Sequence, residues 1–141
     1  NQKIGFVFQF HHLLSEFTAL ENVLMPAWIG NSNYQTKNEA VNLFSELNLS
    51  SKMNFYPNQL SGGERSRVAL LRGIINKPKI LLADEPTGNL DEKNALTLID
   101  LLKKINKDFN QAIIITTHNP DVAKLGCKRF NLVNGVLKTM R

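Results

Sequence analysis

The feature of the chain that most restricts its fold is a pair of short apolar segments with one long amphipathic segment between them. Residues 79–86 read KILLADEP and residues 111–120 read QAIIITTHNP, so each aliphatic run ends in polar residues. Residues 89–110 between them are predicted to form a helix. Its expected buried stripe consists of Ala95, Leu98, Leu102, Ile105 and Phe109. Apolar strands joined through a helix predict an α/β fold with a parallel sheet that is buried on both faces.

The N-terminal segment predicts a further strand and a capped helix. Residues 3–10 form a β-branched and aromatic run, which is typical of a buried strand. Thr18 and Glu21 have the spacing of a capping box, so a helix should begin near Ala19. Pro26 lacks a backbone N–H and is expected to kink or end that helix.

Two further helices are expected before the apolar pair. Residues 30–33 predict a turn, and residues 36–49 a helix with one apolar stripe. The sequence LSGGE at residues 60–64 is a glycine turn that opens another helix, which Pro78 should stop. The block from about 12 to 76 therefore looks like a helical insertion between strands. Near the C-terminus, the dipeptide NG predicts a β-hairpin.

Composition narrows the class of protein. The 141 residues include a single cysteine, which cannot form an internal disulfide, and no apolar run approaches the ~18 residues of a membrane span. We expect a piece of a longer cytosolic protein, because the chain starts without Met and already inside a strand-like run.

The C-terminal half carries an excess of positive charge. Residues 71–141 hold twelve basic and seven acidic side chains. This excess could mark a nucleic-acid face, but without interleaved aromatics a solvated helix surface is favoured.

Candidate chemical groups stand at the ends of predicted strands and at one helix start. Asp84 and Glu85 could hold hydrated Mg²⁺ and orient or deprotonate water, or they could simply be two acids at a strand-to-turn transition. The LSGGE segment could cap its helix or expose N–H donors to a phosphate. His118 could bond a phosphate oxygen, and Gln9 could ligate Mg²⁺, but either residue alone means little.

Taken together, these residues resemble the nucleotide-binding domain of ATP-binding-cassette (ABC) ATPases. The matching motifs are, in chain order, Gln9 of the Q-loop, Leu60 to Glu64 of the signature, Asp84 and Glu85 of Walker B with the catalytic glutamate, Asp91 of the D-loop and His118 of the switch. Five motifs in this order span almost the whole chain. The resemblance implies a P-loop NTPase-like parallel sheet flanked by helices, with an inserted helical subdomain.

The resemblance also implies a role for each matched residue. Glu85 would act as general base on the attacking water, His118 would steady the γ-phosphate of ATP, and Gln9 would sense it. Asp84, together with Gln9, would help to bind the Mg²⁺ ion.

The remaining motif residues would act across a dimer. The resemblance implies that two ATPase subunits meet head to tail, and that Ser61, Gly62, Gly63 and Glu64 of one bind the ATP held by the other. Asp91 would bridge the two subunits.

One motif of the family is missing from the chain. The phosphate-binding P-loop reads G-x-x-x-x-G-K-[ST], and none of the eight glycines is followed by Lys. Residues 1–141 are therefore expected to form a partial domain: 12–76 as the helical and signature subdomain, 1–11 and 77–141 as the remaining catalytic core. Alone, they should neither bind ATP tightly nor hydrolyse it.

An incomplete sheet has a consequence for association. The strands near 80–84 and 112–117 would face a gap or pair directly. Exposed apolar edges would then favour association of copies of this chain.

Two segments indicate a branch of the family. FQFHHLLSEFTALENVLMP (8–26) and DEPTGNLD (84–91) are most similar to the ATPases of bacterial lipoprotein-releasing (Lol) systems. This implies integral membrane transporter subunits as partners, no nucleic acid, and a peripheral location at the cytoplasmic face of the bacterial inner membrane. A DNA-repair or chromosome-organising ABC ATPase and a non-catalytic docking module remain the alternatives.

A few positions depart from the family pattern. Ser66 stands where glutamine is usual, and Leu71 and Gly73 stand where small alanines are usual. A glycine inside that helix should cost about 1 kcal/mol relative to alanine. The adjacent His11 and His12 would diverge by ~100° on a helix and could not chelate one metal. We expect them instead on the surface that meets a membrane subunit.

Overall fold

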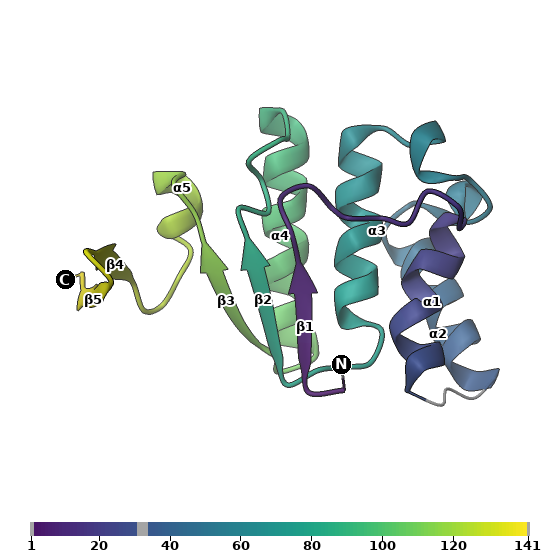
Figure 1. Ribbon diagram of the computed structural model, residues 1–141, viewed down its shortest axis with the longest axis horizontal. Coiled ribbons are helices and arrows are strands. Elements are labelled where there is room, and N and C mark those ends of the chain that lie inside the picture. Colours follow the sequence, from purple (N-terminus) through teal and green to yellow (C-terminus); the bar gives the residue numbers. More distant parts are fainter. Residues whose placement is uncertain (1, 31–33, 141) are drawn as a thin grey trace.

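The computed structural model describes residues 2–30 and 34–140 and contains a parallel sheet, a separate hairpin and a set of helices (Figure 1). The strands are β1 (Ile4–Val7), β2 (Ile80–Asp84), β3 (Ala112–Thr116), β4 (Phe130–Val133) and β5 (Val136–Thr139). The sheet has the order β1-β2-β3, and all its pairings are parallel. The predicted α/β fold with a parallel sheet is confirmed. Strands β2 and β3 pair directly, with no gap between them.

The helices begin and end largely where the sequence signals place them. They are α1 (Ala19–Ile29), α2 (Tyr34–Glu46), α3 (Gly62–Ile74), α4 (Glu92–Asp108) and α5 (Pro120–Ala123), with short 3₁₀ turns at Ser50–Lys52 and Pro57–Gln59. The capping box predicted at Thr18 is present, and Ser61 forms a second one at the start of α3. The expected turn at 30–33 falls mainly on residues 31–33, which lie outside the described residues.

Some boundaries differ from the expectation, among them the end of α2, which stops at Glu46 and not at residue 49. Pro26 does not end α1, which continues to Ile29, because the turn after the proline buries Ala27 in the core. The first strand is shorter than residues 3–10 and stops at Val7, after which the chain leaves the sheet.

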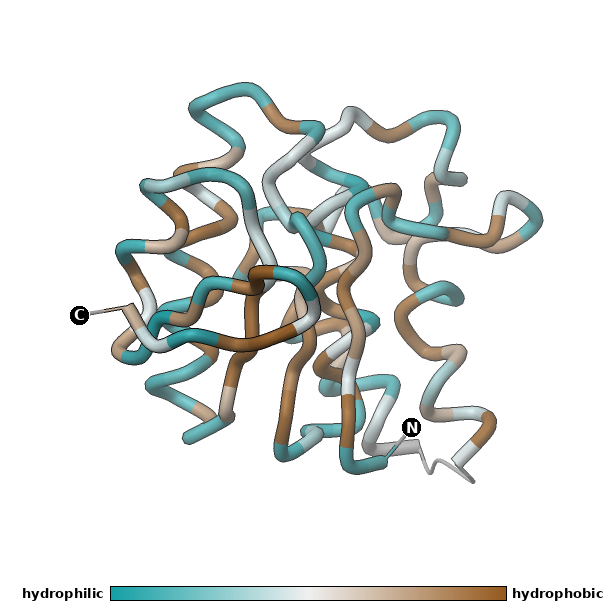
Figure 2. Tube along the Cα trace, turned by 60° about the vertical axis from the view of Figure 1, so that its left-hand side comes forward, coloured by the Kyte–Doolittle hydropathy of each residue, from teal (hydrophilic) through white to brown (hydrophobic). Residues whose placement is uncertain are grey.

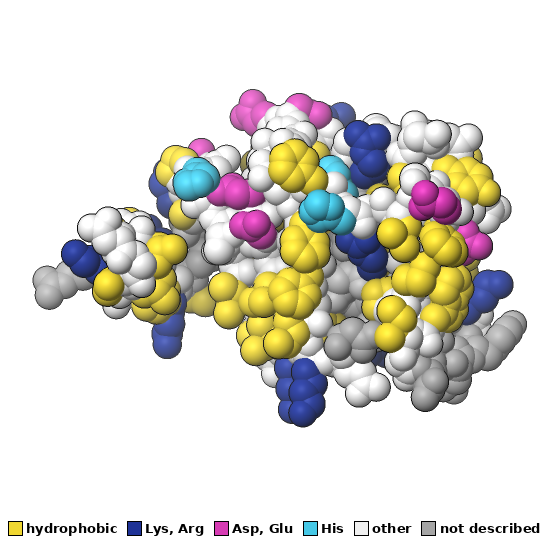
Figure 3. Space-filling view, in the orientation of Figure 1, with side chains coloured by type: hydrophobic (Ala, Val, Ile, Leu, Met, Phe, Trp, Pro, Cys, Tyr) yellow, Lys and Arg dark blue, Asp and Glu magenta, His cyan; other side chains and the backbone are white. Residues whose placement is uncertain are grey.

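The sheet is buried on one face only, which corrects the expectation of two buried faces. Helix α4 lies behind the strands and α3 stands beside β1, and on the face that these helices contact, Leu81 and Ala83 are 0% and 2% exposed (Figures 1 and 2). On the other face, Ile4, Phe6 and Ile114 are 41%, 47% and 55% exposed. Figure 3 shows this open face as a hydrophobic patch over the strands. The apolar sequences of the strands predicted that both faces of the sheet are buried, but none of the described residues covers this second face.

We expect the 141-residue chain to associate through the open face, because contiguous exposed apolar surface favours contact between copies. Light scattering over a concentration series should show species larger than a monomer. Phe6→Ser should reduce the association, whereas Leu96→Ser, at a similarly exposed position on α4, should not. A clean monomer at high concentration would count against this expectation.

Helix α3 approaches β1 at a contact between two glycines. A Cβ atom at Gly5 would lie 2.0 Å from the carbonyl oxygen of Gly73, and one at Gly73 would lie 3.0 Å from the carbonyl oxygen of Phe6. The glycine that departs from the family pattern at position 73 therefore has a packing reason. It allows the helix and strand backbones to touch, which compensates for its low helix propensity.

Replacing Gly5 by Ala should destabilise the fold, because the added methyl group meets a backbone atom that no side-chain rotation can move. We expect Gly5→Ala to lower the free energy of unfolding by about 1–3 kcal/mol, as overpacking usually does. Urea denaturation measures this directly. The control is Gly62→Ala, where a Cβ atom meets nothing within 4 Å. Equal stability of Gly5→Ala and wild type would contradict the close contact.

Candidate functional site

Three of the candidate residues lie just beyond the carboxyl ends of neighbouring strands. Gln9 follows β1, Glu85 directly follows β2, and His118 follows β3. Because the three strands are parallel and adjacent, these residues share one edge of the sheet. Figure 3 shows acidic side chains and histidines along the upper edge of the molecule, above the apolar patch. Ligands of open α/β sheets bind at this edge.

Glu85 has a strained backbone and an oriented carboxylate. Its φ of 42° lies in the left-handed region, which is uncommon for residues other than glycine and asparagine. Its Oε1 accepts a hydrogen bond of 2.6 Å from the backbone N–H of His118, and its Oε2 accepts one of 3.3 Å from the Thr117 hydroxyl. Such strain clusters at functional sites, where the surroundings hold it in place.

Asp84 is the last residue of β2 and bonds the neighbouring strand. Its Oδ1 accepts a hydrogen bond of 2.5 Å from the hydroxyl of Thr116, its register partner on β3. The two adjacent carboxylates thus bond two adjacent threonines, Asp84 with Thr116 and Glu85 with Thr117. Sequence reasoning missed both threonines, although their place directly before His118 at a strand end was a usable signal.

Gln9 and His118 flank this carboxylate pair differently. The side chain of Gln9 packs against the turn after Glu85, since a Cβ atom at Gly88 would lie 2.9 Å from its Nε2. Its backbone carbonyl accepts a hydrogen bond of 3.2 Å from Asn89. The imidazole of His118 is 99% exposed, with its Nε2 3.7 Å from Glu85 Oε1. It is therefore free to contact a group that enters from solvent.

The signature residues form the N-terminus of α3. The Ser61 hydroxyl accepts a hydrogen bond from the backbone N–H of Glu64, and the Glu64 carboxylate accepts one of 2.8 Å from the N–H of Ser61. This bond lowers the pKa of Glu64, and Lys52, 3.4 Å away, adds to the effect. Gly62 faces open space, so a partner could approach its backbone closely.

Asp91 caps α4 beside the start of α3. Its carboxylate accepts hydrogen bonds from the backbone N–H of Asn94 at 2.9 Å and from the Asn94 amide at 2.6 Å, and these bonds lower its pKa. The Asn94 side chain also lies against Gly63, where a Cβ atom would come within 2.1 Å of it. The structure thus forms two groups: Gln9, Asp84, Glu85 and His118 at the strand ends, and the signature with Asp91 at the helix starts.

The segment after Gln9 is not helical, so the helical argument about the two histidines does not apply. His11 and His12 both have positive φ, 62° and 46°. The imidazole of His11 turns toward α3, with Nε2 2.6 Å from the Ser66 hydroxyl. Burial, followed by the nearby cations Arg65 and Arg72, lowers the pKa of His11.

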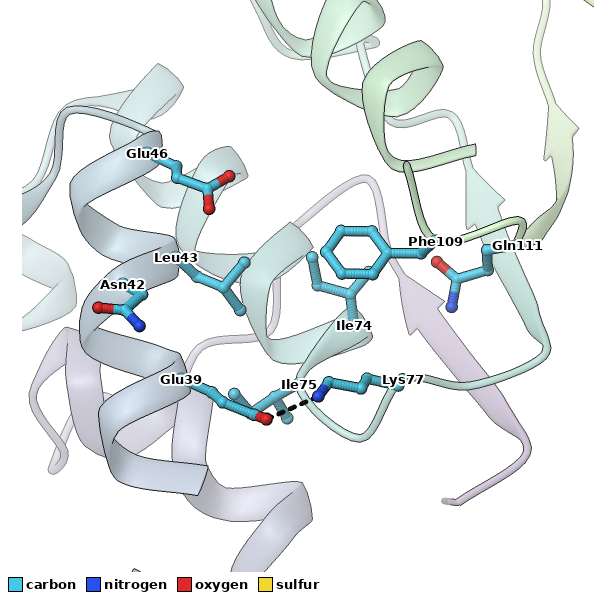
Figure 4. Close-up of a pocket in the computed structure, with 9 residues that line it drawn as sticks. All are labelled: Glu39, Asn42, Leu43, Glu46, Ile74, Ile75, Lys77, Phe109 and Gln111. Carbon is cyan, nitrogen blue, oxygen red and sulfur yellow. Dashed lines mark hydrogen bonds and ion pairs between the residues drawn. The ribbon is translucent and has the colours of Figure 1, made fainter. Parts of the chain in front are cut away.

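A cavity of about 170 Å³ lies near the amino ends of β2 and β3, whereas the strand-end group lies beyond their carboxyl ends (Figure 4 shows the cavity). Its walls come from α2, the end of α3 and the segment before β3, and Lys77 bonds Glu39 across its rim at 2.6 Å. Phe109, expected in the buried stripe of α4, is 46% exposed here because it is the C-cap residue. Lys77 and Gln111 precede β2 and β3, so the cavity is remote from the strand-end group.

Comparisons with known proteins agree on one family. A family model described as ABC transporter matches residues 1–88. The lipoprotein-releasing system ATP-binding protein LolD 2 of Chlorobium chlorochromatii is 49% identical over 97% of this chain and 57% of its own length. LolD of Cytophaga hutchinsonii is 50% identical over 97% and 63%, respectively. The chain therefore spans about 57% to 63% of the length of these relatives.

Solved structures give the same picture. The dimeric post-hydrolysis state of the ATP-binding cassette MJ0796 bound to ADP and Pi matches with a TM-score of 0.83 and 37% identity, over 99% of this chain and 63% of that one. An inward-facing putative metal-chelate type ABC transporter matches with a TM-score of 0.87 and 28% identity, over 98% and 57%.

Proposed function

Because the chain belongs to the ABC transporter ATPase family, we propose that its whole protein hydrolyses ATP to power lipoprotein release, or a related export step, at the bacterial inner membrane. The observation that carries the proposal is the convergence of Gln9, Glu85 and His118 beyond three adjacent parallel strands. This edge therefore carries a carboxylate base (Glu85), a side-chain amide (Gln9) and an exposed imidazole (His118). Such a set suits the attack of water on a phosphoryl group.

The proposed roles follow from the contacts of each side chain. The carboxylate of Glu85, oriented by the His118 N–H, takes the proton of the attacking water. The exposed imidazole of His118 bonds an oxygen of the γ-phosphate, and the Gln9 amide contacts the same region. Hydrogen bonds that are fixed before the reaction cost little reorganisation when charge develops.

Asp84 fits a magnesium ion that is shared with nucleotide and water. The described residues contain no group of three His, Cys, Asp or Glu side chains that could cage a metal. The Asp84 carboxylate is exposed, and only its Oδ1 is bonded by Thr116. Mg²⁺ commonly binds one or two carboxylates and keeps waters and phosphate oxygens as its other ligands. When bound, the ion would neutralise phosphate charge, and Asp84, with Gln9 nearby, would hold it.

The helix-start group suits a role across a dimer. The solved cassette MJ0796 is described as a dimer. In a head-to-tail pair, the starts of α3 and α4, where Ser61 and Asp91 are exposed, would face the partner subunit. Ser61, Gly62 and Gly63, with Glu64 behind them, would then meet the γ-phosphate bound to the partner, and Asp91 would bridge the subunits.

We further propose that residues 12–76 form a helical subdomain and that the other residues belong to the catalytic core. Helix α3 would join the two parts, since it contacts both α1 and β1. No helix among the described residues is both long and apolar enough to cross a membrane. Independently of this, the similarity to LolD proteins supports integral membrane transporter subunits as the partners at the inner membrane.

The experiment that tests the proposal uses the full-length protein with its membrane subunits. Reconstituted in vesicles, the complex should release a bound lipoprotein when ATP is added and should not do so with a non-hydrolysable analogue. Release that is independent of ATP would refute the proposal. If the complex hydrolysed ATP without releasing any lipoprotein, the proposed ATPase activity would stand, but lipoproteins would be rejected as the substrate.

The DNA-repair alternative is disfavoured by the segment between Gln9 and the signature. ATPases of that kind carry a long coiled coil there, whereas this segment contains α1 of 11 residues and α2 of 13. Filter binding of DNA at physiological salt should show no specific retention. ATP turnover by the full-length protein would separately exclude a purely docking role.

A further inference from the structure

The loop after β1 adopts an uncommon backbone conformation that needs support. His11 and His12 are consecutive, and both have a positive φ. L-residues rarely adopt this region, and two in succession persist only where neighbouring groups fix them. The supporting groups come from α3.

Arg72 provides the first support. Its Nη1 donates a hydrogen bond to the carbonyl oxygen of His12, and its Nη2 donates one to the carbonyl oxygen of His11, both at 2.5 Å. A guanidinium presents several N–H donors in a rigid plane and can therefore bond two successive carbonyls at once. A lysine ammonium lacks this geometry.

Ser66 provides the second support and extends it along α3. Its hydroxyl lies 2.6 Å from Nε2 of His11 and donates a hydrogen bond of 3.0 Å to the carbonyl oxygen of Gly62. A hydroxyl has a single proton to donate. With that proton on the Gly62 carbonyl, the Ser66 oxygen accepts from His11 only when Nε2 carries a hydrogen, so the path depends on this imidazole tautomer. The result is a continuous hydrogen-bonded path from the Gln9 loop to the signature.

We propose that His11, Ser66 and Arg72 are positioning residues that hold the Gln9 loop in a fixed relation to the signature at the start of α3 in the same subunit. This inference rests on the proposed function, because the two motifs matter together only in ATP hydrolysis. None of the three residues touches a reacting atom. The serine at position 66, which departs from the family pattern, makes the connection.

The first test reads the proton on the imidazole. In full-length protein labelled with ¹⁵N-histidine, the ring nitrogen signals of His11 should be those of the tautomer with hydrogen on Nε2. Ser66→Ala should shift these signals. Ser15→Ala, which removes a serine of the same loop whose hydroxyl bonds its neighbour Glu16, should leave them unchanged. A hydrogen on Nδ1 in the wild type would overturn the path.

The second test separates positioning from a general loss of structure. In the full-length protein, His11→Ala and Ser66→Ala should lower kcat about three- to tenfold, the range of one lost hydrogen bond, with KM for ATP within about twofold. His11→Gln, whose amide nitrogen reaches the place of Nε2, should keep the wild-type rate. Both substitutions at position 11 lose the imidazole equally, so their difference isolates the donor.

Each outcome has one meaning. Wild-type rates in His11→Ala and Ser66→Ala, or equal losses in His11→Gln and His11→Ala, would overturn the positioning role while the proposed function stands. An inactive wild type would refute the proposed function, and the positioning role with it.

Discussion

Glu85→Gln in the full-length protein is expected to retain ATP binding and to lower the rate of ATP hydrolysis by about 10²–10⁴-fold, the usual contribution of a positioned general base. The amide oxygen of glutamine can still accept the hydrogen bond from the His118 N–H, so the local geometry should survive. The amide cannot take a proton from water, so catalysis should fail. Steady-state kinetics and equilibrium dialysis with labelled ATP measure the two effects.

The matched control is Glu92→Gln. Glu92 lies in the first turn of α4, is exposed and makes no part of the strand-end group, so its charge can be removed without touching the site. Its rate should stay within about twofold of the wild type, as is usual for surface substitutions. Normal turnover in Glu85→Gln would reject the assignment of the base.

The 141-residue chain alone is expected not to bind Mg-ATP with micromolar affinity. The chain has no P-loop sequence to supply N–H groups and a lysine to the phosphates. The helix starts at the site edge do not replace it, because acidic side chains already occupy them. Glu64 bonds the start of α3, and Asp91 caps α4. Because these carboxylates already accept backbone N–H groups there, the two helix starts alone are not expected to hold a triphosphate that no P-loop anchors.

Isothermal titration calorimetry decides this second prediction. The full-length protein, titrated in the same buffer, serves as the positive control and should show Mg²⁺-dependent binding. The chain alone should give only heats of dilution. Micromolar binding that depends on Mg²⁺ would show that the described edge is a sufficient nucleotide site.

Local signals in the sequence predicted local structure well. The spacing of Thr18 and Glu21 located the start of α1, and Ser61 with Glu64 located that of α3. The Asn134-Gly135 pair predicted the turn between β4 and β5, where both residues have positive φ. In each case the structure depends on contacts within a few residues, which a sequence displays directly.

Features that depend on distant elements could not be predicted in the same way. An apolar strand looks the same whether one or two faces are covered, so the exposure of Phe6 and Ile114 had no local signal. Phe109 fitted the helical stripe, but the helix ends before it and leaves it on the rim of the cavity. The stripe alone could not show which of its members lies beyond the last turn.

For the candidate site, the sequence supplied a set of positions but not the contacts between them. The resemblance to the family singled out Gln9, Glu85 and His118, and the topology shows why they can share one edge. The resemblance did not reveal that the backbone N–H of His118 orients the Glu85 carboxylate, or that the Ser66 hydroxyl contacts the His11 imidazole. These contacts join residues 33 and 55 positions apart, a separation at which spacing carries no information.

The glycine contact between β1 and α3 changes how defects in this protein should be read. Neither Gly5 nor Gly73 is a candidate reacting group, but the helix that packs on this contact carries the signature at its start and Arg72 next to Gly73. A side chain added at Gly5 would push the whole helix away from the strand. A substitution there would be measured as a loss of ATPase activity, although its cause would be the changed distance between the backbones of β1 and α3.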